Sequence, residues 1–127
     1  GLTPLAKIVA HCSFANEPLY FTRSPIYAIE KALSLSGLKL NEIDLFEINE
    51  AFSCVPMVAI DTLKIPSDKV NVNGGAVSMG HPIGASGSRI LVTLLNALKN
   101  RNLKYGLAAI CIGGGEASAM IIENCDL

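Results

Sequence analysis

Short apolar runs alternate along this chain with longer stretches in which apolar residues recur at the spacing of a helix. The runs typical of strands lie at residues 5–15, 45–48, 69–72, 106–112 and 117–123. The stretches typical of helices lie at residues 24–36, 50–64 and 84–100. Strands that alternate with helices build α/β folds. The order therefore predicts a mixed, mostly parallel sheet with helices on both faces, closed by one antiparallel pair of strands.

Local signals place several helix ends. Ser24 and Pro25 suit the N-cap and the first position of a helix, and Gly37 suits its end. Asn41 is a candidate cap for a short turn before the strand at 45–48. Pro56 cannot sit inside a regular helix, so the stretch at 50–64 is expected to kink or begin near that residue.

The composition restricts the functional class. No linker or short repeat divides the 127 residues, so we expect one domain. Ten Lys and Arg against eleven Asp and Glu leave a net charge of −1, which argues against a nucleic-acid-binding protein. Only 17% of the residues are charged, against a typical quarter. This low share indicates that a partner covers part of the surface.

Membrane insertion and disulfide bonding are not indicated. No apolar run approaches the roughly 20 residues of a membrane-spanning helix, and the start does not resemble a signal peptide. The four cysteines (Cys12, Cys54, Cys111 and Cys125) match neither a zinc pattern nor a C-x-x-C pair. We therefore expect free thiols and a reducing compartment, either cytoplasmic or mitochondrial.

Three segments contain candidate functional residues. Asn49-Glu50-Ala51-Phe52 follows a predicted strand, where open α/β sheets bind ligands. The alternative is that Asn49 and Glu50 only cap a helix.

The second segment, residues 74–87, has five glycines and contains His81 just before a predicted helix N-terminus, where a histidine can act as a base or an oxyanion donor. The alternatives are a structural turn or a phosphate loop, although the segment lacks the order of a Walker A or dinucleotide motif. The other histidine, His11, lies within a strand and is interpreted as structural.

The third segment is Cys111-Ile112-Gly113-Gly114-Gly115, which places a cysteine at a strand end beside backbone N–H groups. A thiolate there can act as a nucleophile or a base, whereas the alternative is a structural cysteine.

Together the motifs N-E-A-F, G-H-P-I-G-A-S-G and C-I-G-G-G, in this order, resemble the C-terminal half of a thiolase over roughly residues 5–125. Within that family, residues 71–90 are most similar to the acetoacetyl-CoA thiolases, also called acetyl-CoA acetyltransferases. This segment reads N-V-N-G-G-A-V-S-M-G-H-P-I-G-A-S-G-S-R-I. The resemblance implies one half of a five-layer α-β-α-β-α architecture. One departure is Ala117, where the family often has a glycine.

The resemblance also implies catalytic roles. Asn49 holds a water that forms an oxyanion hole with Nε2 of His81, and His81 activates a nucleophilic cysteine. Cys111 is the second cysteine, an activated acid and base, and the N–H of Gly113 belongs to a second oxyanion hole. Such donors stabilise the charge that develops on a thioester oxygen.

Ala51 and Phe52 are implied to shape the pocket beside the reacting carbon. The scheme requires no metal and no cofactor. Its substrates are coenzyme A thioesters. In the mitochondrial branch of the family a potassium ion binds near the position that matches Val77, so a monovalent cation there is an open alternative.

The family's acyl-accepting cysteine and much of its CoA-binding surface belong to an N-terminal half that has no counterpart in this chain. We therefore expect residues 1–127 to be the C-terminal domain of a longer acyltransferase, inactive alone, which forms a homodimer or homotetramer when complete. The expected reaction of lipid and fatty acid metabolism condenses two acetyl-CoA into acetoacetyl-CoA and CoA, or runs the reverse thiolysis.

Three alternatives remain. A degradative 3-ketoacyl-CoA thiolase has the same motifs and longer substrates. A non-catalytic thiolase-like domain could serve in binding or assembly, but Asn49, His81 and Cys111 are all present. A ketosynthase relative would use a Cys-His-His set, and the G-H-P-I-G-A-S-G and C-I-G-G-G segments argue against it.

Overall fold

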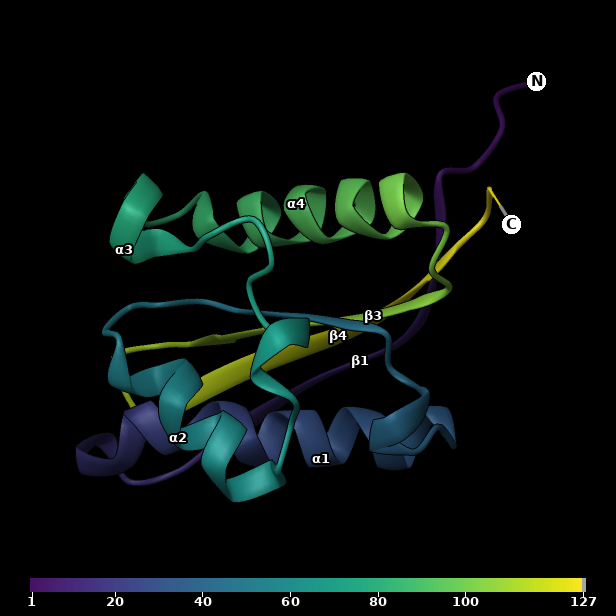
Figure 1. Cartoon of the computed structure of the whole chain (residues 1–127). Helices are drawn as coiled ribbons and strands as arrows, with labels where there is room; N and C mark the ends of the chain where they lie inside the picture. The colour runs from purple at the N-terminus through teal and green to yellow at the C-terminus, as the bar shows by residue number, and fades with distance from the viewer. Residues whose placement is uncertain (127) are drawn as a thin grey trace.

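Four strands form one sheet in the order β1-β4-β3-β2, with helices on both of its faces (Figure 1). The computed structural model describes residues 1–126. Its strands are β1 (Ala6–Ala15), β2 (Leu45–Ile48), β3 (Tyr105–Cys111) and β4 (Glu116–Asn124). Its helices are α1 (Ser24–Ser36), α2 (Cys54–Leu63), α3 (Ala76–Met79) and α4 (Ser86–Arg101), with short 3-10 turns at Pro18–Arg23, Leu40–Glu42 and Ser67–Lys69. Helix α4 covers one face, and α1 and α2 lie on the other.

The sheet is mixed, as expected, but it is not mostly parallel. Strand β4 pairs antiparallel with both β1 and β3, and only β2 and β3 run parallel. The expected strand at 69–72 is reduced to two isolated bridges, one between Val70 and Phe46 and one between Val72 and Gly74. The cause is Asn71, which has a φ of 49°. Its side chain makes the hydrogen bonds to β2 that the backbone of a paired strand would make. Its amide accepts from the N–H of Ile48 and donates to the oxygen of Ile48, each at 2.9 Å.

The helix ends largely follow the local signals. Helix α1 begins at Ser24 and ends before Gly37, whose φ is 74°, and Pro56 lies in the first turn of α2. Ser24 does not cap its helix, because its hydroxyl instead donates to the oxygen of Gly115 at 2.6 Å. Asn41 lies inside the Leu40–Glu42 turn, which is closed instead by the Glu42 carboxylate on the N–H of Lys39. The four-residue α3 was not predicted, because so short a helix shows no periodicity.

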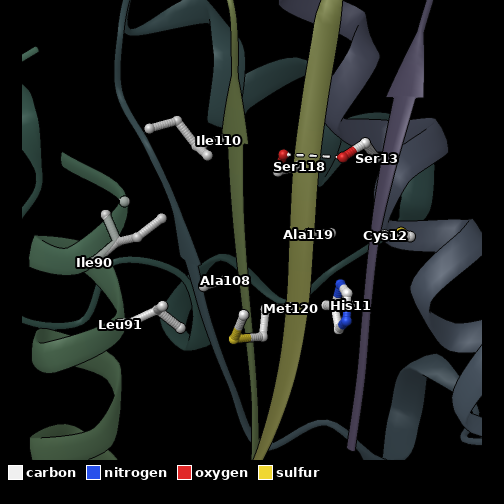
Figure 2. Close-up of a pocket in the computed structure, with 11 residues that line it drawn as sticks. His11, Cys12, Ser13, Ile90, Leu91, Ala108, Ile110, Ser118, Ala119 and Met120 are labelled. Carbon is white, nitrogen blue, oxygen red and sulfur yellow. Dashed lines mark hydrogen bonds between the residues drawn. The ribbon is translucent and has the colours of Figure 1, made fainter. Parts of the chain in front are cut away.

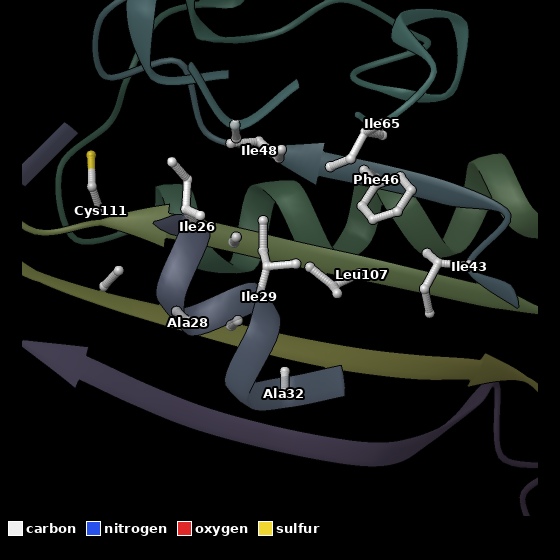
Figure 3. Packing of buried hydrophobic residues seen from close by; sticks show 14 of the residues in the cluster. Ile26, Ala28, Ile29, Ala32, Ile43, Phe46, Ile48, Ile65, Leu107 and Cys111 are labelled. Carbon is white, nitrogen blue, oxygen red and sulfur yellow. The ribbon is translucent and has the colours of Figure 1, made fainter. Parts of the chain in front are cut away.

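Apolar side chains form two clusters, one on each face of the sheet. The α1-side core joins α1 and α2 to the sheet and includes Ile29, Phe46, Ile48, Leu107 and Cys111 (Figure 3). The smaller α4-side core joins α4 to the opposite face and includes Leu45, Ile90, Leu94 and Leu98. Ala117 is completely buried in the α1-side core, so an alanine fits where the family often has glycine.

In the part of the chain that the structure describes, no helix combines the length and the apolar character needed to cross a membrane.

Candidate active site

The parallel strands β2 and β3 end at the same edge of the sheet, and two of the candidate residues lie there. Asn49 follows the last residue of β2, and its N–H donates to the oxygen of Ala109 in β3 at 2.9 Å. Cys111 is the last residue of β3. The carboxyl ends of parallel strands are the usual ligand-binding edge of an α/β sheet. The strand register therefore brings Asn49 and the end of β3 side by side.

His81 reaches this edge from the glycine-rich segment between α3 and α4. Its Nε2 lies 3.5 Å from Nδ2 of the buried Asn49. Its Nδ1 lies 2.5 Å from Oγ of Ser86, and the Ser86 hydroxyl donates to the oxygen of Pro82 at 3.2 Å. Because the hydroxyl hydrogen is engaged by Pro82, Ser86 accepts from an N–H at Nδ1. This assignment leaves Nε2 of neutral His81 with a lone pair, ready to accept a proton.

His81 and Cys111 line the same cavity, of about 350 Å³. The other lining residues include Ser86, Ile110 and Gly113, and a Cβ built on Gly113 would meet no atom within 4 Å. Ala51 and Phe52 are not among the lining residues. Phe52 is largely exposed and packs edge-on against Phe21, with 6.0 Å between ring centroids. The structure therefore gathers Asn49, His81, Cys111 and Gly113 at one edge and leaves Phe52 outside the cavity.

Cys111 is a buried thiol in this chain. Burial raises the pKa of the Cys111 thiol above its usual range, a backbone hydrogen bond opposes this shift, and the neighbouring Cys54 adds to it. In this chain the backbone hydrogen bond lowers the pKa of the thiol less than burial raises it. The activated thiolate implied by the resemblance belongs to the complete active site and stays a prediction.

A buried ion pair lies beside the site, between β2 and α4. Glu47 is 1% exposed, and its Oε2 lies 3.1 Å from Nη1 of Arg89. Burial raises the pKa of the Glu47 carboxyl to about 7, although Arg89 lowers it. Oε1 of Glu47 and Oδ1 of Asn49 have no hydrogen-bond partner among residues 1–126. Because residues 47 and 49 point to the same side of the strand, the pair and the amide share one side of β2.

Two residues that organise this edge, Ser86 and Glu50, were not predicted from the sequence. Ser86 fixes the His81 ring; its position five residues after His81, at a predicted helix start, was the available signal. Glu50 was considered only as a helix cap, yet α2 has no side-chain cap. Its carboxylate instead accepts from the N–H of Val77, in a segment 27 residues away.

Two further features bear on ligands. Within residues 1–126, no group of three or more His, Cys, Asp and Glu side chains is arranged to hold a metal ion. Val77, the position considered for a nearby monovalent cation, is largely exposed.

His11 does not line the cavity of His81 but lies on β1, beside Met120 of β4 and on the side of the sheet that faces Leu91 of α4 (Figure 2). It lines a second cavity, of about 230 Å³, with Ser13, Ser118 and Met120. Ser13 and Ser118 are 3.4 Å apart across the β1–β4 pair. The four cysteines are all free, and Cys54 and Cys125 are exposed.

Comparison with known proteins gives consistent matches. The family model described as thiolase, C-terminal domain, matches residues 2–124. The acetyl-CoA acetyltransferase of Escherichia coli K12 is 53% identical over 124 residues, which cover 98% of this chain and 32% of that protein. The mitochondrial acetyl-CoA acetyltransferase of Bos taurus is 53% identical over 124 residues, 98% of this chain and 29% of that protein.

Solved structures match equally well. The Acat5 thiolase of Ascaris suum in complex with coenzyme A has a TM-score of 0.91 at 48% identity, over 97% of this chain and 32% of that one. Human mitochondrial 3-ketoacyl-CoA thiolase has a TM-score of 0.94 at 42% identity, over 97% of this chain and 31% of that one. The chain thus spans about a third of the length of the relatives it matches.

Proposed function

We propose that this chain, which belongs to the thiolase family and corresponds to its C-terminal domain, supplies one half of the active site of an acetyl-CoA C-acetyltransferase. The complete enzyme would join two acetyl-CoA into acetoacetyl-CoA and free CoA, or cleave acetoacetyl-CoA with CoA. The observation that carries the proposal is the juxtaposition of Asn49, His81 and Cys111 at the carboxyl ends of β2 and β3.

His81 is proposed to activate the acyl-accepting cysteine of an N-terminal domain. Nε2 of His81 takes the thiol proton, and the thiolate attacks the thioester carbonyl of the first acetyl-CoA. As the acetyl group moves to the cysteine, the CoA sulfur leaves with a proton from Cys111, so that Nε2 of His81 keeps its proton and Cys111 becomes a thiolate. The lone pair at Nε2 that Ser86 and Pro82 impose supports this role, because a general base must present an unprotonated nitrogen.

Cys111 is proposed to remove a proton from the methyl carbon of the second acetyl-CoA. The enolate carbon attacks the acetyl group on the N-terminal cysteine, which leaves as a thiolate and yields acetoacetyl-CoA. A protonated Nε2 of His81 and a water held by Asn49 would stabilise the enolate oxygen, and the N–H of Gly113 would stabilise the acyl-enzyme oxygen. The free Oδ1 and the buried amide of Asn49 support its role as a water ligand.

An N-terminal thiolase domain is the proposed partner, together with acyl-CoA and CoA. Large apolar side chains remain exposed around the site and on the sheet edge, including Val77, Ile83, Ile112 and Ile8. The cavity lined by His11 and Met120 is a further opening on the sheet (Figure 2). A second domain and a homodimer or homotetramer would cover them. The free cysteines support a reducing compartment, the cytosol or the mitochondrial matrix.

The test compares two polypeptides, this chain alone and this chain joined to a thiolase N-terminal domain. Cleavage of acetoacetyl-CoA by CoA is measured for both. We expect turnover from the joined polypeptide and none from the chain alone, because no acyl-enzyme forms without the N-terminal cysteine. A joined polypeptide that folds and binds CoA without turnover would favour the non-catalytic binding or assembly domain.

A degradative 3-ketoacyl-CoA thiolase is the second candidate, because the human mitochondrial enzyme of that name matches this chain with a TM-score of 0.94, the same as the acetyl-CoA acetyltransferase of Bacillus anthracis. The two are separated by assaying 3-ketoacyl-CoA substrates of increasing chain length. Acetoacetyl-CoA should be the best substrate of an acetyl-CoA acetyltransferase, whereas a preference for longer chains would support the second candidate.

A further inference from the structure

Glu50 connects two segments that are distant in the sequence. Its Oε2 accepts from the N–H of Val77 at 2.8 Å, and its Oε1 accepts from Nδ2 of Asn71 at 3.3 Å. Val77 lies in α3, the short helix that precedes His81 by one residue. Glu50 itself directly follows Asn49. One carboxylate therefore joins the segment that carries Asn49 to the segment that carries His81.

The partner on the Asn71 side has a fixed orientation. The Oδ1 of Asn71 accepts from the N–H of Ile48, and its Nδ2 donates to the oxygen of Ile48. The amide cannot rotate without losing both bonds, so it presents a donor to Glu50. The backbone N–H of Val77 is also a donor. Each donor meets a different oxygen of Glu50, and a carboxylate offers an acceptor at both positions, whereas a side-chain amide offers an acceptor at only one.

The chain leaves room for this carboxylate at Gly75. Gly75 is buried, and a Cβ built there would lie 2.4 Å from Cδ of Glu50. The φ of Gly75 is −136°, which any residue adopts, so its backbone conformation does not require glycine. The missing side chain at residue 75 is explained by the space that Glu50 occupies.

We propose that Glu50 is a positioning residue that holds His81 beside Asn49, by anchoring residues 74–80 to the end of β2. The proposal rests on the function proposed above. Glu50 does not line the cavity shared by His81 and Cys111, so it acts through His81 and not on the substrate. A single turn separates the Val77 anchor from His81: the N–H of Gly80 donates to the oxygen of Ala76 at 2.8 Å. Movement of Val77 is therefore transmitted to the imidazole.

Three variants separate hydrogen bonding from space filling. Glu50→Gln keeps the shape but turns an amide NH₂ toward one of the two fixed donors. Gly75→Ala keeps Glu50 but places a methyl group where its carboxylate lies. In the double variant Glu50→Ala/Gly75→Ala the methyl group fills part of the vacated space and offers no acceptor. Glu30→Gln is the matched control, because it makes the same change from carboxylate to carboxamide at an exposed position of α1.

The first readout needs no activity and uses the 127-residue chain. Hydrogen exchange of the Val77 amide is followed by NMR, with thermal melting as the measure of folding. We expect exchange at Val77 to accelerate at least tenfold in all three variants and to stay unchanged in Glu30→Gln. Unchanged exchange at Val77 in Glu50→Gln would overturn the proposal, even if the joined polypeptide proved inactive.

The second readout is kinetic and uses the chain joined to its N-terminal domain. We expect kcat to fall about 100-fold in Glu50→Gln, because displacing a catalytic group by about 1 Å slows the reaction by about 100-fold. The KM for acetoacetyl-CoA should change less than threefold. The double variant should remain as slow as either single variant. Recovery of kcat in the double variant, or a change confined to KM, would overturn the positioning role. Absence of turnover in the unmodified polypeptide would instead count against the proposed function.

Discussion

The two faces of the sheet differ in what they bury. The α1-side core is a continuous apolar cluster, with Phe46, Ile29 and Leu107 at its centre. The α4 side combines a smaller apolar cluster with a buried carboxylate, Glu47, and a buried hydroxyl, Ser86, whereas the buried hydroxyl of Ser24 on the α1 side is paired with the oxygen of Gly115. Buried polar groups reduce stability unless they are fully paired, and Oε1 of Glu47 has no hydrogen-bond partner among residues 1–126. We infer that the α1 side stabilises the sheet and that the α4 side organises the site.

The site draws on both sides at the strand ends. Cys111 belongs to the α1-side core, whereas His81 is held by Ser86 at the start of α4. An apolar core on one side and a layer with buried polar groups on the other therefore meet in the cavity that they line together. The following changes should separate the two contributions, beginning with the largest.

Phe46→Ala should destabilise the chain most, because Phe46 is 1% exposed and central to the α1-side core. Truncating a buried Phe leaves a cavity and costs about 3–5 kcal/mol of unfolding free energy. Urea unfolding of the chain measures the change. Val92→Ala, on the exposed side of α4, serves as the control and should cost no more than about 0.5 kcal/mol. A loss below 1 kcal/mol for Phe46→Ala would contradict the assignment of the α1-side core as the part that stabilises the sheet.

His81→Ala should have the opposite effect, a large loss of activity and a small loss of stability. Removing one oxyanion donor costs about 10²–10³ in rate, or about 2.7–4 kcal/mol, and His81 would also serve as the base. The joined polypeptide is assayed for acetoacetyl-CoA cleavage, and its unfolding is followed in parallel. Activity retained within tenfold would remove His81 from the proposed mechanism.

Glu47→Gln should change how stability depends on pH. The pKa of Glu47 is raised from 4.5 to about 7, so between these values the folded chain holds a proton that the unfolded chain has lost. Unfolding free energy therefore falls as pH rises through this window, by about 3 kcal/mol in total. The variant should lack this part of the slope. Urea unfolding at pH 5 and pH 8 compares the two proteins, and equal slopes would show that Glu47 does not titrate there.

Ser86→Ala should have the smallest effect on stability, about 1 kcal/mol, because it removes one hydroxyl from a buried network. Its more specific effect is on the His81 ring, which loses the acceptor that holds the hydrogen at Nδ1. Nitrogen chemical shifts of His81 should move toward the tautomer with the hydrogen at Nε2. An unchanged tautomer would show that Ser86 does not set the proton position.

Much of the fold could be predicted because local signals and tertiary packing agree. The strand at Leu45–Ile48 and helix α4 follow their apolar patterns, and Gly37 ends α1 as its conformation requires. The sheet direction could not be derived from the order of elements, because β1 joins at the far edge beside β4. The strand at 69–72 failed because a side-chain amide, that of Asn71, replaced backbone pairing.

The candidate site was predicted in part. Motif order identified Asn49, His81 and Cys111, and the structure brings them to one edge. The supporting contacts of Ser86 and Glu50 were not predicted, since they depend on how α3 and α4 fold back over β2. The burial that raises the pKa of Cys111 in this chain could not be predicted, because the sequence does not reveal how deeply a thiol is buried.

The most direct test of the account is proton removal by Cys111. The joined polypeptide is incubated with acetyl-CoA in D₂O, and deuterium incorporation into the methyl group is followed by mass spectrometry. We predict steady incorporation with the unmodified polypeptide and a loss of at least 100-fold in Cys111→Ala, with folding unchanged. Incorporation at the unmodified rate in Cys111→Ala would contradict the assignment of this domain as the half that supplies the base.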